Sequence, residues 1–104
     1  MKTLKLNIEV KNGTSIVGIV FKLFKKGGNK PLIEETKKGS FSYEFTSLNG
    51  EYDLYIIGSN PLSETRKTTI GLEGEGFTYD KTSDANPTTR IGKSYFVTYS
   101  FNTN

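Results

Sequence analysis

The sequence contains no cysteine and no histidine, and its only alanine is Ala85. Without cysteine, the chain can form no disulfide and no thiolate metal site, and it has no thiol nucleophile. Without histidine, it lacks the commonest general base and the commonest transition-metal ligand. The scarcity of alanine contrasts with six tyrosines and seven phenylalanines. This balance favours strands over helices, because aromatic residues are strand formers and alanine is the best helix former.

Long hydrophobic runs are also missing. The longest apolar stretch, residues 16–21, is far too short to span a bilayer. The first seven residues alternate between polar and apolar types, which is unlike a secretory signal peptide. We therefore expect a soluble protein without membrane insertion, located in the cytoplasm or in a virion. A chain of 104 residues is expected to form one domain, residues 1–104.

The net charge of +3 is distributed unevenly along the chain. Residues 1–52 carry nine lysines against five acidic residues, whereas residues 53–104 carry five basic residues against six acidic ones. Most of the cations are lysines, which are hydrated point charges rather than bidentate forks. This composition favours weak contact with anionic surfaces over specific phosphate recognition.

Alternation of polar and apolar residues is the dominant pattern. It predicts strands at residues 4–10, 16–25, 32–36, 41–46, 51–56, 65–72 and 93–101, with a further short segment at 77–79. No window of 11 residues has apolar positions at helical spacing. The sequence therefore predicts an all-β fold, an immunoglobulin-like antiparallel β-sandwich of about seven strands. A small closed barrel is the alternative, because alternation alone does not distinguish the two.

The turns are marked by glycine, proline and asparagine. Asn12-Gly13 is the preferred pair for a type I′ turn and predicts a hairpin between the first two strands. Residues 26–31 and 80–87 are polar and are expected to be loops.

Three segments resemble a known class: Lys30-Pro31-Leu32, residues 39–45 and residues 48–56. They are similar to the transthyretin-like, carboxypeptidase-regulatory-like class of immunoglobulin-type sandwiches, which carries a core hairpin with the pattern Gly-x-Phe and then Leu-x-x-Gly-x-Tyr-x-Leu. The resemblance implies that Gly50 supplies a turn and that three side chains fill the core, Phe41, Tyr52 and Leu54. It also implies a non-catalytic module with a binding or structural role.

Related collagen-adhesin domains can form a Lys–Asn isopeptide bond that a buried acid promotes. Lys5 and Asn102 are present on the first and last strands, but Ile56 occupies the position of the acid. We therefore expect no crosslink.

Other motifs in the sequence give little support for catalysis, phosphate binding or calcium binding. Glu34 and Glu35 are adjacent and point to opposite sides of a strand, so they cannot act as a catalytic pair. The glycine-rich residues 71–76 contain two glutamates that would repel a phosphate, and Glu73 and Glu75 are expected to be solvated. Residues 80–86 lack the spacing of a calcium loop. We predict no catalytic residues, no cofactor and no metal site.

The strongest candidate is an interface. Three aromatic residues lie opposite the main alternation of their strands, namely Phe24, Tyr55 and Phe96. Together with Lys22, Lys25 and Lys26, they form the candidate interface, because exposed apolar patches mark docking sites. These lysines belong to a wider cluster with Lys30, Lys37 and Lys38, which could bind single-stranded nucleic acid. Lysines that guard a sheet edge are the favoured interpretation.

These features favour a non-enzymatic structural protein that docks on a larger assembly. The chain looks like the small auxiliary, or decoration, proteins of tailed-phage capsids, so the expected partner is a major capsid protein. A domain that starts at Met1 and has ordered ends is expected to be held in a complex. The alternative is a cell-surface module that binds a protein or a glycan, for which the expected sugar platform is Tyr55, Tyr95 and Tyr99 together with loop acids.

Overall fold

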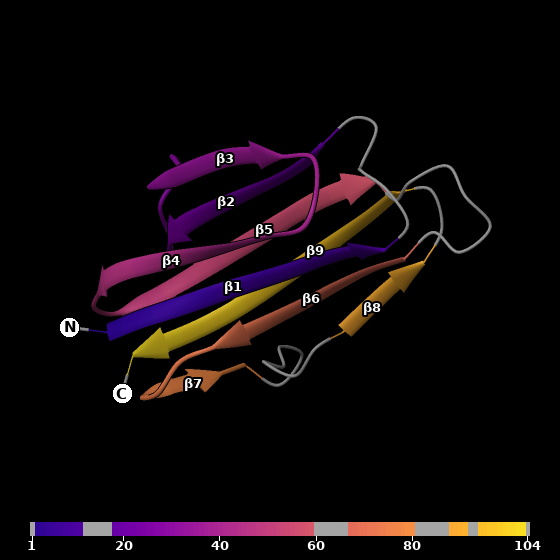
Figure 1. Cartoon of the computed structure of the whole chain (residues 1–104). Coiled ribbons are helices and arrows are strands. Elements are labelled where there is room, and N and C mark those ends of the chain that lie inside the picture. The colour runs from indigo at the N-terminus through magenta and orange to yellow at the C-terminus, as the bar shows by residue number, and fades with distance from the viewer. Residues whose placement is uncertain (1, 12–17, 60–66, 81–87, 92–93, 104) are drawn as a thin grey trace.

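The computed structural model describes residues 2–11, 18–59, 67–80, 88–91 and 94–103 (Figure 1). These residues form nine strands and no helix: β1 (Lys2–Lys11), β2 (Ile19–Lys25), β3 (Ile33–Lys37), β4 (Phe41–Leu48), β5 (Glu51–Ser59), β6 (Lys67–Glu73), β7 (Phe77–Tyr79), β8 (Thr88–Ile91) and β9 (Ser94–Thr103). This confirms the predicted all-β class. Within the same residues, no helix is long and apolar enough to cross a membrane.

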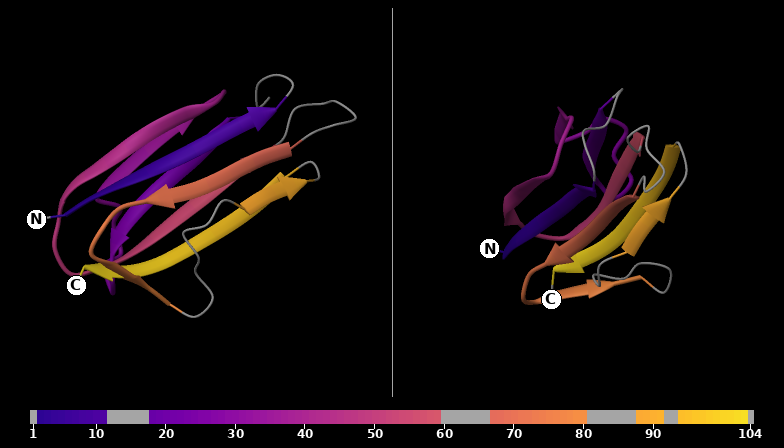
Figure 2. Two further views of the ribbon diagram at one scale, coloured as in Figure 1. Left: turned by 60° about the horizontal axis from the view of Figure 1, so that its bottom comes forward. Right: turned by 45° about the vertical axis from the view of Figure 1, so that its right-hand side comes forward.

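The strands form two antiparallel sheets that face each other (Figure 2). The order is β4-β1-β6-β8 in the four-stranded sheet and β3-β2-β5-β9-β7 in the five-stranded sheet. The molecule is thus the predicted sandwich, with more strands in its described part than the expected seven or so. Sequence patterns did not predict β8, because its four residues, Thr88–Ile91, show no apolar alternation.

Successive strands mostly belong to different sheets. Among the strands described, only β2 and β3 are consecutive and also pair with each other. The hairpin predicted at Asn12-Gly13 is therefore wrong, since β1 and β2 lie in separate layers; the turn itself lies outside the described residues. The hairpin that the resemblance implies also does not form, because β4 and β5 lie in separate layers. Gly50, at a φ of 114°, turns the chain from one layer to the other.

The core between the sheets contains the apolar residues that the alternation predicted. Its buried side chains are Leu4, Leu6, Ile8, Val10, Ile19, Phe21, Leu23, Phe45, Leu48, Tyr52, Leu54, Ile56, Ile70, Leu72, Val97, Tyr99 and Phe101. Thr68 is the buried polar side chain among the described residues. Burying each large apolar side chain contributes about 1.5–3 kcal/mol, so this layer is the main source of stability.

A bulge in β4 lets two side chains at odd spacing enter this core. Leu4 pairs with Phe45 and Lys2 pairs with Leu48, so Thr46 and Ser47 together stand opposite one residue of β1. Ser47 has a φ of 58°, a left-handed conformation that is uncommon for a residue with a side chain. As a result, Phe45 and Leu48 are both buried.

Candidate functional site

The three aromatic residues predicted from the sequence lie side by side on the outer side of the five-stranded sheet. Phe24 is on β2, Tyr55 on β5 and Phe96 on β9, and these three strands are neighbours. The ring centroids of Phe24 and Tyr55 are 5.4 Å apart, and those of Tyr55 and Phe96 are 5.9 Å apart. Residues far apart in the sequence thus form one continuous row of rings.

Two aliphatic residues that were not predicted to belong to the interface extend this row. Ile57 pairs with Val20 on one side and with Phe96 on the other. Ile57 is 42% exposed and Phe96 is 59% exposed. We call the five residues Val20, Phe24, Tyr55, Ile57 and Phe96 the aromatic face. The signal for Val20 and Ile57 was present in the sequence, because both break the alternation of their strands with an apolar residue.

The predicted lysines divide between this face and the end of the sheet. Lys22 lies on the aromatic face, where it pairs in register with Tyr55 and its Nζ is 3.8 Å from a carboxylate oxygen of Glu34. Lys25 instead reaches the chain reversal between β4 and β5, where its Nζ donates a hydrogen bond of 3.5 Å to the Asn49 carbonyl. Lys26 lies 4.0 Å from Glu51 at the same end. The structure therefore places Lys22, but not Lys25 and Lys26, beside the aromatic rings.

The wider lysine cluster does not form one continuous basic patch. Lys25 and Lys26 lie at one end of the β2–β3 pair, while Lys37 pairs with Ile19 at the other end. Lys37 lies 3.7 Å from the Glu35 carboxylate on the core side of the edge strand β3. Charges that point inward on an edge strand discourage pairing with another chain.

The sugar platform predicted from Tyr55, Tyr95 and Tyr99 does not form. Tyr55 faces outward, whereas Tyr99 is buried in the core and Tyr95 packs against it. Burial raises the pKa of Tyr95, and a hydrogen bond with Thr68 partly offsets this shift. Tyr95 therefore has a packing role between the sheets.

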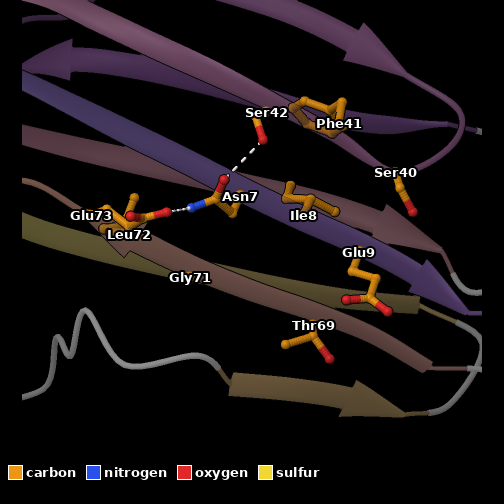
Figure 3. A pocket seen from close by; sticks show the side chains of 10 residues that line it. All are labelled: Asn7, Ile8, Glu9, Ser40, Phe41, Ser42, Thr69, Gly71, Leu72 and Glu73. Atoms are coloured by element: carbon orange, nitrogen blue, oxygen red, sulfur yellow. Dashed lines mark hydrogen bonds between the residues drawn. The ribbon is translucent and has the colours of Figure 1, made fainter.

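A second surface was not predicted from the sequence. The outer side of the four-stranded sheet carries a hollow of about 740 Å³, which we call the polar hollow (Figure 3). Its lining comes from β1, β4 and β6 and the residue before β4: Asn7, Ile8, Glu9, Ser40, Phe41, Ser42, Thr69, Gly71, Leu72 and Glu73. Gly71 pairs in register with Asn7, so the middle of β6 contributes no side chain there.

Hydrogen bonds hold the polar side chains of this hollow in place. The Ser42 hydroxyl donates to Asn7 Oδ1 at 2.8 Å, and Asn7 Nδ2 donates to the Glu73 carboxylate (Figure 3). The hydroxyls of Thr69 and Thr89 are hydrogen-bonded at 3.0 Å. The Val10 amide donates to the Ser40 hydroxyl at 2.8 Å.

The sequence predicts that Glu73 is solvated. The structure places it at the end of β6, where it is exposed and accepts a hydrogen bond from Asn7. A glycine in a strand pattern, Gly71, was the available signal for this site, because such glycines often mark a close approach. No three acidic side chains among the described residues come together as a metal site would require.

Comparison with known proteins provides no assignment. No protein-family model, curated protein or solved structure matches the chain. The resemblance to transthyretin-like sandwiches therefore stays a prediction. The arguments for function rest on the two surfaces described above.

Proposed function

We propose that the protein is a non-enzymatic structural protein that docks on a larger assembly through the aromatic face. The observation that supports this proposal is the row of contacting rings on the outer side of the five-stranded sheet. Phe96 and Ile57 are more than a third exposed although they touch apolar neighbours. Contiguous exposed apolar surface of this kind typically marks a protein interface.

The composition of the face favours a protein partner. Aromatic residues are enriched in the buried centres of protein interfaces, and tyrosine and phenylalanine give a large contact area at low entropic cost. Lys22 at the margin is paired with Glu34, and Asp53 beside Phe24 accepts a hydrogen bond from Ser100. A neutral apolar centre with a polar margin is the usual composition of such an interface.

The proposed assembly is a virus capsid, and the proposed partner is its major capsid protein. Small sandwich domains of this kind are similar to capsid auxiliary proteins. A sheet face with exposed rings can bind a capsid subunit without catalysing a reaction. A cell-surface module that binds a protein through the same face is the alternative. The two proposals name different partners but use the same surface of this protein.

The test is co-sedimentation of the purified chain with undecorated capsids from the virus whose genome encodes it. We expect saturable binding that Phe96→Ala weakens. Failure of the wild-type chain to sediment with capsids would contradict the capsid assignment. Sedimentation velocity of the chain alone serves as the second measurement. A dimer that Phe96→Ala disrupts would show that the face joins two copies instead.

A further inference from the structure

The structure also contains a ligand-sized site away from the aromatic face. We infer that the polar hollow on the outer side of the four-stranded sheet binds a neutral saccharide. This inference is independent of the proposed docking function, because the two surfaces lie on opposite sides of the sandwich.

The hollow has the dimensions of a small-molecule site. Its volume of about 740 Å³ falls within the usual range for ligand pockets. The absence of a side chain at Gly71 opens the middle of the sheet surface opposite Asn7. A site of this size holds one or two sugar rings.

The polar groups around the hollow suit a ligand with many hydroxyls. The Asn7 amide is held by Ser42 and Glu73, which leaves one Nδ2 hydrogen and the second Glu73 oxygen to bind a ligand. Glu9 and Thr69 add another carboxylate and another hydroxyl to the lining. Sugar hydroxyls both donate and accept hydrogen bonds, so they can pair with carboxylates, amides and hydroxyls alike.

The existing hydrogen bonds favour binding because they fix these groups before the ligand arrives. Asn7 is held on both sides, and Thr69 is held by Thr89. Side chains that are ordered in the free protein lose less entropy on binding.

The charge of the lining selects against anionic ligands. Two of its residues, Glu9 and Glu73, are acidic, and none of the ten residues is a lysine or an arginine. A phosphate, a sulfate or a sialic acid would meet two carboxylates there, and Lys5, which pairs in register with Glu73, does not line the hollow. Recognition of these groups normally uses arginine or lysine. The lining therefore points to uncharged sugars.

The test is a glycan array with neutral, sialylated and sulfated glycans, followed by NMR titration of the ¹⁵N-labelled chain with the neutral disaccharides cellobiose, lactose and N,N′-diacetylchitobiose. We expect at least one neutral glycan to bind, with saturable shifts at Asn7, Ser42 and Gly71. Gly71→Val should weaken binding by about tenfold or more, because the new side chain fills the hollow. Valine suits a strand, and Gly71 has no positive φ, so the variant should fold.

Matched variants distinguish loss of the binding site from loss of the folded structure. Glu44→Gln is the control, because Glu44 lies on the outer side of the same sheet but does not line the hollow. Asn7→Ala and Glu73→Gln provide the same test if Gly71→Val does not fold. Absence of neutral glycan binding, binding of charged glycans only, or equal binding by wild type and all three variants would each overturn the inference. Phe96→Ala should leave glycan binding unchanged.

Discussion

Substitution of Phe96 best distinguishes an effect on docking affinity from an effect on the stability of the fold. The Phe96 side chain can bury about 200 Å². Because Phe96 is 59% exposed, about 120 Å² of it is still available to a partner. At about 25 cal/mol per Å², covering that area contributes about 3 kcal/mol. We therefore expect Phe96→Ala to weaken docking by roughly a hundredfold.

The same substitution should have a smaller effect on the free energy of unfolding. The part of Phe96 already buried corresponds to no more than about 2 kcal/mol, and its ring contact with Tyr55 is included in that area. Urea denaturation measures this loss. Co-sedimentation with capsids, at several chain concentrations, measures the docking affinity.

Phe77→Ala is the matched control. Phe77 is half-buried on β7 and packs edge-on against Phe101 with centroids 5.7 Å apart, on the core side of the sheet. This variant should lose stability and keep the docking affinity of the wild type. If folded Phe96→Ala docks as tightly as the wild type, the aromatic face is not the docking surface.

Three further predictions concern the fold. Gly58→Ala should lower the free energy of unfolding by about 1–3 kcal/mol in urea denaturation, because the new Cβ would lie 2.4 Å from the Tyr95 hydroxyl oxygen; unchanged stability would show that the ring moves aside freely. Ser47→Gly should raise the same free energy by up to about 1 kcal/mol, because glycine relieves the left-handed conformation; a loss would show that the serine side chain stabilises the bulge. Burial raises the pKa of Tyr79 and Tyr95 above 10.0, so the unfolded chain ionises first and stability should fall as the pH rises above that value. Urea denaturation with tyrosinate absorbance measures this effect, and stability that stays constant up to pH 12 would contradict it.

Most of the core could be predicted from the sequence because burial in a sandwich follows a period of two. The inward positions of β1, β2, β5 and β9 were all assigned from their alternation. The bulge at Ser47 could not be predicted, because nothing in the local sequence requires a left-handed residue there. Strand pairing was also beyond reach, since alternation shows which side chains point inward but not which layer a strand joins.

The candidate sites, like the fold, could be predicted only in part from the sequence. The row of Phe24, Tyr55 and Phe96 was predicted as a possibility, and the strand order then placed the three rings next to one another. The polar hollow was missed because its residues come from three strands whose pairing was unknown. Gly71 is the sequence signal for this site, but it becomes informative only when Asn7 is found opposite it.

The alternation of successive strands between layers has a consequence for how the chain acquires its structure. β9 lies between β5 and β7, so the five-stranded sheet lacks an interior strand until residues 94–103 have been synthesised. Pairs such as β1–β4 and β5–β9 close long loops, and folds dominated by distant pairings typically form in milliseconds to seconds. β5 and β7 therefore lack this neighbour until late in synthesis, and refolding of the released polypeptide is expected to be slow and sensitive to its concentration.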